Sequence, residues 1–119
     1  MDSTFDPPDT DDPFAAMCAL LALLPADVRA NMVTMYTEAL AVQMEQLGAA
    51  VAGSDDAVMR DLAHKVAGSA GMMQNALLSR AARRMELALR EGRPDAAREA
   101  WPEVQDSMRR TLQALTAGC

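Results

Sequence analysis

The sequence predicts an all-α protein, and three observations support this. Half of the 119 residues are hydrophobic but only 3% are aromatic, so alanine, leucine and methionine supply most of the apolar mass. These residues favour helices, whereas strand-favouring residues are few and isoleucine is absent. Apolar residues also recur at three- and four-residue intervals along most of the chain, which is the periodicity of amphipathic helices. The length fits one domain with a modest single core.

A first short helix is expected after Asp12-Pro13, because aspartate caps helix N-termini and proline suits the first helical position. It should end near Pro25, where a second helix of about 25 residues begins and continues to Gly53. The predicted buried face of the first helix is Phe14, Met17, Leu21 and Leu24, and that of the second is Val28, Met32, Tyr36, Leu40, Leu47 and Val51.

Three further helices follow. Ser54, followed by Asp55 and Asp56, is expected to cap the third helix, which runs to about Met73. The predicted buried face of the third helix is Val58, Leu62, Val66, Ala70 and Met73. After a break at Gln74-Asn75, the fourth has Leu78, Ala82, Met85 and Leu89 inward and Arg80, Arg83, Arg84 and Arg90 outward, and it ends at Gly92-Arg93-Pro94. The last has Trp101, Val104, Met108, Leu112 and Leu115 on one face, with Pro102 expected to kink the helix or restart it.

Short connections between long amphipathic helices favour antiparallel neighbours. We therefore expect an antiparallel up-down four-helix bundle with a short extra N-terminal helix covering one end.

The net charge of −6 is concentrated at the N-terminus, where five aspartates lie among the first twelve residues. The remaining residues hold 12 acidic (17 − 5) and 11 basic side chains, so their net charge is −1. We expect residues 1–12 to form an acidic disordered tail and residues 13–119 to form the folded domain. The folded part lacks the basic surface of a nucleic-acid-binding protein.

Localisation can be predicted from the termini and the cysteines. The acidic N-terminus is not a secretory signal, and the apolar run from Phe14 to Leu24 is too short to span a membrane. Cys18 and Cys119 are two isolated cysteines rather than a disulfide framework, which fits a reducing compartment. These features predict a cytoplasmic protein with no membrane partner.

His64 is the only histidine of the chain. On a helical wheel it lies roughly 160° from Val66, the centre of the predicted buried face, so it should point outward. Asp61, Lys65, Gly68 and Gly71 share that outward surface, and Lys65 is the only lysine. An exposed histidine on a helix is most often a plain surface residue, and Gly71 could belong to a fraying helix end.

Gly68 fits a fraying end poorly, because Ala70 and Met73 continue the buried face beyond it. A glycine inside a helix costs roughly 1 kcal/mol relative to alanine. We interpret the glycines as a lowered surface that lets a partner approach the imidazole, with Lys65 as the cation next to it.

The segment Leu62-Ala63-His64-Lys65-Val66-Ala67-Gly68-Ser69-Ala70-Gly71 closely resembles the phosphoacceptor signature of the histidine phosphotransfer (HPt) family. Leu78, Ala82, Met85 and Glu86 continue the resemblance with the family's Leu-x-x-x-Ala-x-x-Leu-Glu spacing, methionine replacing leucine. The chain departs from the family at Ala67, where many members carry lysine, and at Gln74-Asn75, which replaces a common Gly-Ala.

The resemblance implies that His64 accepts a phosphoryl group from a receiver-domain aspartate and passes it to another receiver. Partners would be response-regulator receiver domains and a hybrid sensor histidine kinase, with the protein itself a monomer. It would need no cofactor of its own and no metal, because Mg²⁺ would be bound by the receiver. Lys65, Gly68, Ser69 and Gly71 would support the phosphoryl group or the partner, and Asp61, Met72, Arg83, Arg84 and Leu87 would contribute to docking, with Glu86 also flanking the site.

Other functions remain open. Autonomous kinase activity is not expected, because the sequence has no glycine-rich nucleotide loop and is too short for an ATP-binding domain. Asp61 and His64 make a single Asp-x-x-His pair, which is weak support for a metal enzyme. The main alternative is a non-catalytic helical adaptor that binds a receiver or kinase. Another is a terminal sensor phosphorylated on His64 directly by a kinase.

Overall fold

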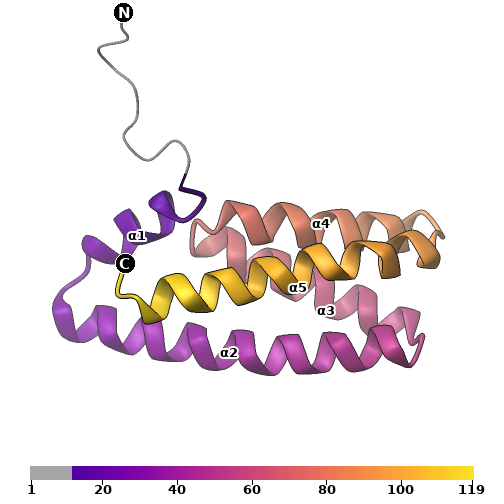
Figure 1. Ribbon diagram of the computed structural model, residues 1–119, viewed down its shortest axis with the longest axis horizontal. Coiled ribbons are helices and arrows are strands. Elements are labelled where there is room, and N and C mark those ends of the chain that lie inside the picture. The colour runs from indigo at the N-terminus through magenta and orange to yellow at the C-terminus, as the bar shows by residue number, and fades with distance from the viewer. Residues whose placement is uncertain (1–11) are drawn as a thin grey trace, which may run out of the picture.

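The computed structural model describes residues 12–119, which form five α-helices (Figure 1). The predicted acidic tail lies outside the described residues apart from Asp12. The helices are α1 (Ala15–Ala22), α2 (Ala26–Ala52), α3 (Asp56–Met72), α4 (Ala76–Arg90) and α5 (Pro94–Thr116). The prediction of an all-helical domain is therefore confirmed.

The four long helices lie side by side as a bundle, and each of them contacts two others (Figure 1). α3 packs against α2 and α4, and α5 packs against α4 and α2. The short helix α1 lies at the end of the bundle where the chain terminates (Figure 1). No helix in the described range is both long and apolar enough to cross a membrane.

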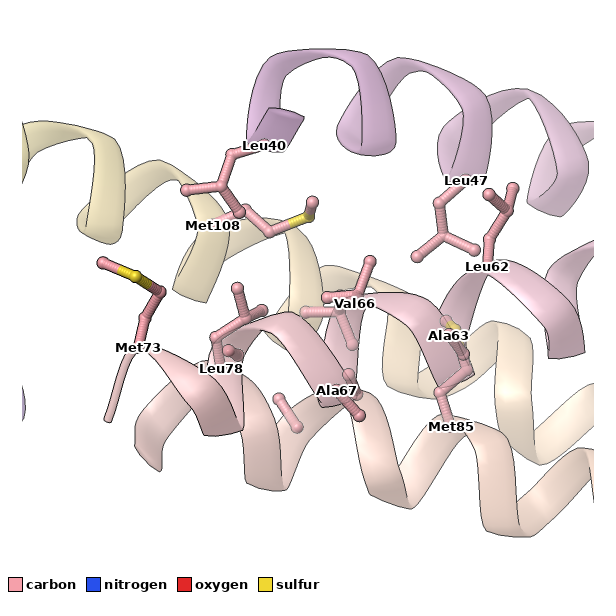
Figure 2. Close-up of a cluster of buried hydrophobic side chains, with 14 of the residues drawn as sticks. Leu40, Leu47, Leu62, Ala63, Val66, Ala67, Met73, Leu78, Met85 and Met108 are labelled. Atoms are coloured by element: carbon pink, nitrogen blue, oxygen red, sulfur yellow. The ribbon is translucent and has the colours of Figure 1, made fainter. Parts of the chain in front are cut away.

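Leucine, valine, alanine and methionine fill the space between the long helices. Figure 2 shows Leu40 and Leu47 of α2 facing Leu62 and Val66 of α3, with Met108 of α5 beside them. Four of these five side chains are completely buried, and Leu62 is nearly so. This packing sets the rotation of α3 about its axis and thereby decides which α3 residues face outward.

Two of the predicted buried faces need correction. Val28 and Met32 at the start of α2 are 45% and 38% exposed, because they line an open groove between α2 and the C-terminal end of α3. Val58 in the first turn of α3 is 44% exposed. The remaining positions of the five predicted faces are buried or half-buried.

The starts of α1 and α3 differ from expectation by one or two residues. Asp12 Oδ1 accepts a hydrogen bond from the Phe14 amide at 2.9 Å, but the helix itself begins at Ala15. Asp55, rather than Ser54, caps α3 by accepting a hydrogen bond from the Val58 amide at 3.3 Å. Ser54 has a φ of 54°, which is the left-handed turn conformation rather than that of a capping residue.

Pro102 does not restart the last helix, so that part of the prediction is wrong. α5 runs without interruption from Pro94 to Thr116. Pro102 has no amide hydrogen to pair with the carbonyl of Arg98, and the helix continues without that one bond.

Cys18 and Cys119 are joined in a disulfide, with their Cα atoms 5.0 Å apart. The expectation of two isolated thiols is therefore wrong, and the cysteines no longer argue for a reducing compartment. The two residues are 101 positions apart in sequence, and only the placement of α1 beside the end of α5 brings them together. Arg29 of α2 also holds α1, because its guanidinium donates to the carbonyl oxygens of Leu21 and Leu24, each at 3.0 Å.

The predicted break between α3 and α4 occurs at Met73–Asn75, with Gln74 at a φ of 60°. Asn75 is completely buried, and its Nδ2 donates to Tyr36 Oη of α2 at 3.2 Å and to Thr111 Oγ1 of α5 at 2.9 Å. These hydrogen bonds fix the turn to both neighbouring helices and so set the register between α3 and α4.

Candidate functional site

His64 projects from the middle of α3, and 65% of its side chain is exposed. It points outward because Ala63, Val66 and Ala67 are buried in the bundle core. The sequence-based placement of the histidine on the outer face of this helix is thus confirmed.

One ring nitrogen of His64 is held by a carboxylate from the neighbouring helix. Nδ1 lies 2.7 Å from Oε2 of Glu86 on α4. The Glu86 side chain is only 8% exposed, and the same oxygen lies 3.0 Å from Nη2 of Arg90. Arg90 therefore compensates part of the negative charge that Glu86 carries at this poorly solvated position.

This contact assigns the tautomer of the imidazole. A carboxylate accepts hydrogen bonds, so Nδ1 carries the proton in the neutral ring and Nε2 keeps its lone pair. Nδ1 is engaged with a fixed partner, whereas Nε2 of the exposed ring makes no hydrogen bond to residues 12–119. The arrangement presents an oriented nitrogen nucleophile at the protein surface.

The imidazole borders a shallow hollow between α3 and α4. Its lining is made of Ala57, Arg60, Asp61, His64, Glu86 and Arg90. Two guanidinium groups and two carboxylates thus surround the histidine. Lys65 does not line the hollow, and its Nζ lies 3.3 Å from Oδ2 of Asp61, one turn away on the same helix.

Gly68 and Gly71 have different surroundings. A Cβ built on Gly68 would meet no atom within 4 Å, so the surface one turn beyond His64 is open. A Cβ on Gly71 would lie 3.8 Å from Ser79 Oγ and 4.0 Å from Arg83 Nη2, so that glycine faces α4. Ser69 does not reach toward the histidine, because its hydroxyl donates to the backbone carbonyls of its own helix, those of Lys65 and Val66.

The predicted docking residues fall into separate groups. Asp61 borders the histidine, and Arg83 lies beside Gly71. Met72 is 81% exposed and lines the α2–α3 groove with Val28, Met32 and Met35. Leu87 is 53% exposed but does not line the hollow that holds His64.

Of the candidates on α4, Arg84 does not lie opposite His64. Glu86, which was among the flanking candidates, is the residue opposite His64. Arg84 Nη2 is instead 2.8 Å from Oε1 of Glu103 on α5. Arg84 and Glu86 are two positions apart on α4, so their side chains point in different directions around the helix. Glu86 therefore faces α3 while Arg84 faces α5.

Arg60 and Arg90 were not proposed as site residues from the sequence, although both line the hollow. A helical-spacing argument could have found them. Arg60 precedes His64 by four residues and Arg90 follows Glu86 by four, and side chains four apart are neighbours on a helix surface.

Within residues 12–119, no group of three or more His, Cys, Asp or Glu side chains is arranged to hold a metal ion.

A comparison with protein-family models identifies the family. The family model described as the Hpt domain matches residues 31–117, which include all of α3, α4 and α5 and most of α2. No curated protein and no solved structure shows significant similarity to the chain. The match covers most of the sequence and contains both His64 and Glu86, and the chain belongs to the Hpt domain family of phosphorelay histidine phosphotransfer proteins.

Proposed function

We propose that this protein is the phosphotransfer intermediate of a multistep phosphorelay. His64, presented by an antiparallel up-down four-helix bundle, accepts a phosphoryl group from an aspartate of one receiver domain and passes it to an aspartate of another. The observation that carries this proposal is the 2.7 Å contact between His64 Nδ1 and the poorly exposed carboxylate of Glu86, which leaves Nε2 free for attack.

The chemical step follows from this geometry. The Nε2 lone pair forms a bond to phosphorus while the bond between phosphorus and the aspartyl oxygen breaks, and the aspartate leaves as a carboxylate. The ring keeps its proton on Nδ1 and becomes positively charged, and the Glu86 carboxylate stabilises that charge through the hydrogen bond. Transfer to the second receiver reverses these events.

The partner would supply the charges that stabilise the phosphoryl oxygens during transfer. Mg²⁺ in the receiver would neutralise the oxygens of the transferring group, so this chain needs to supply only the positioned nucleophile and a docking surface. We therefore propose that the phosphoryl group reaches His64 from another protein.

The surface beside His64 suits a bulky partner. His64, Gly68 and Met72 are spaced four residues apart and form one row along α3. Gly68 has no side chain, so the helix surface is open between the imidazole and the α2–α3 groove. That groove is apolar and is lined by Val28, Met32, Met35 and Met72. We propose that the receiver covers this row and that Met72 contributes apolar contact.

The proposal is tested by incubating the protein with a phosphorylated receiver and following acid-labile, alkali-stable label. Label should appear on the wild-type chain and be absent from His64→Gln. Label of the same amount on His64→Gln would refute the assignment of the acceptor.

The same experiment separates the alternatives. A protein that binds the phosphorylated receiver but is never labelled would be an adaptor. A protein labelled by a kinase but unable to pass the group to any receiver would be a terminal sensor.

A further inference from the structure

We propose that Arg60 is the cation that contacts the phosphoryl group on His64, and that Lys65 acts indirectly by neutralising Asp61. This inference rests on the proposed function of His64 as phosphoacceptor. It assigns to Arg60 the supporting role that the sequence alone suggested for Lys65.

The direction of the imidazole favours Arg60. Side chains of an α-helix lean toward its N-terminus, so the ring of His64 lies over the turn that contains residues 60 and 61. Arg60 is four residues before His64, and both line the hollow between α3 and α4. A phosphoryl group on Nε2 would therefore lie beside the guanidinium of Arg60.

Three other cations near the site are engaged elsewhere. Lys65 Nζ is 3.3 Å from Asp61 Oδ2, and Arg90 Nη2 is 3.0 Å from Glu86 Oε2. Arg84 is paired with Glu103. Arg60, by contrast, makes no ion pair with any carboxylate of residues 12–119, although it lines the hollow.

The charge distribution in the hollow explains why another cation is needed. A phosphoryl group carries about −1.5 to −2 charges near neutral pH and would be repelled by Asp61 and Glu86. Lys65 compensates Asp61, and Arg90 together with the phosphorylated ring compensates Glu86. Arg60 is then the group whose positive charge remains for the phosphoryl oxygens, and its planar guanidinium can donate two hydrogen bonds to them.

A small phosphoryl donor tests Arg60 without any receiver. Phosphoramidate transfers its phosphoryl group to Nε2 as its own N–P bond breaks and ammonia leaves. The rate of His64 labelling and the half-life of the phosphohistidine would be measured by intact mass for wild type, Arg60→Gln, Arg60→Lys and Lys65→Gln. Arg109→Gln, an exposed arginine on α5 that makes no ion pair within residues 12–119, is the matched control.

Arg60→Gln should be labelled about five-fold more slowly than wild type, because a charge-assisted hydrogen bond to the incoming group is lost. Arg60→Lys should recover part of the rate, Lys65→Gln should lose less than Arg60→Gln, and Arg109→Gln should match wild type. The ³¹P chemical shift of the phosphohistidine should change in Arg60→Gln, which a purely structural role of the arginine would not produce. Equal rates and shifts for Arg60→Gln and wild type, or a greater loss in Lys65→Gln, would overturn the inference.

The two proposals can fail separately. A protein labelled by phosphoramidate but never by a phosphorylated receiver would refute the relay function, while the Arg60 comparison would still decide the present inference. A wild-type protein that neither phosphoramidate nor a phosphorylated receiver can label at His64 would overturn both.

Discussion

His64 Nδ1 and Glu86 Oε2 lie 2.7 Å apart across the interface of α3 and α4, with the imidazole exposed and the carboxylate nearly buried. His64 must remain accessible to a partner, whereas Glu86 is fixed in the bundle, and the contact connects the two. A buried carboxylate can orient an exposed ring because its own position is held by packing and by Arg90. Glu86 is thus a positioning residue for the nucleophile.

Glu86→Gln should slow phosphoryl transfer from a receiver by about ten-fold, because the charge that stabilises the phosphorylated ring is removed. The amide can donate as well as accept, so the preference for the Nδ1–H tautomer should also weaken. Transfer rates together with ¹⁵N NMR of the imidazole measure the two effects. Glu91→Gln, an exposed acid at the end of α4, is the control, and an unchanged tautomer population in Glu86→Gln would contradict the positioning role.

Asn75→Ala should reduce the free energy of unfolding by about 1–3 kcal/mol, because it leaves the buried hydroxyl groups of Tyr36 and Thr111 without the amide that donates to them. Urea denaturation monitored by circular dichroism measures the loss. Asn31→Ala, at an exposed position of α2, should change stability by less than about 0.5 kcal/mol. A similar loss in both variants would show that the network does not stabilise the turn.

The helices and the outward direction of His64 could be predicted because both depend on local periodicity. Val66 and Ala70 mark the buried face of α3, and the position of His64 relative to them is set by the helix itself. The same reasoning failed for Val28 and Met32, because it cannot tell whether a neighbouring helix closes over an apolar face.

Relationships between helices were less accessible from the sequence. The pairing of His64 with Glu86 depends on the register of α3 against α4, which follows from the turn at Gln74 and the buried side chain of Asn75. The disulfide depends on the position of α1 at the end of the bundle. No sequence pattern around Cys18 or Cys119 indicates that the two cysteines lie close together.

Cys18→Ser should lower the free energy of unfolding by about 2–4 kcal/mol, because it opens a covalent loop that restricts the unfolded chain. Cys119→Ser should have an equal effect, and the double variant should be no less stable than either single one. Wild type in a dithiol reductant should unfold at the temperature of these variants, whereas the variants should not respond to it. A thiol titration that finds two free thiols in unreduced protein would contradict the disulfide.

Burial raises the pKa of Tyr36, with a smaller opposing effect from the hydrogen bond with Asn75. Above the ordinary value of 10.0 the unfolded tyrosine loses its proton while the folded one stays neutral, so stability should fall as the pH rises beyond that value. Tyr36→Phe should be less stable at neutral pH but should lose less stability in alkali. Tyrosinate absorbance of this single tyrosine checks the titration directly, and parallel stability curves for both proteins above pH 10.0 would refute the prediction.

Gly68 offers a test that separates folding from docking. A methyl group at this position would meet no atom within 4 Å, so Gly68→Ala should stabilise the helix by about 1 kcal/mol. Gly48→Ala is the contrasting variant, because its Cβ would lie 3.3 Å from Cζ2 of Trp101 and the gain should be lost to crowding.

Gly68→Gln should keep the fold and accept a phosphoryl group from phosphoramidate at nearly the wild-type rate, because the small donor approaches His64 from the hollow on the other side of the ring. Transfer from a phosphorylated receiver should be slowed by about ten-fold or more. The glutamine side chain would project between the imidazole and the α2–α3 groove, where the partner must approach closely. Stopped-flow measurement of receiver dephosphorylation follows transfer from the receiver, and intact mass follows labelling by phosphoramidate. Equal rates for wild type and Gly68→Gln with the receiver would mean that the open surface at this glycine has no part in docking, and that its absence of a side chain must be explained by something other than the partner.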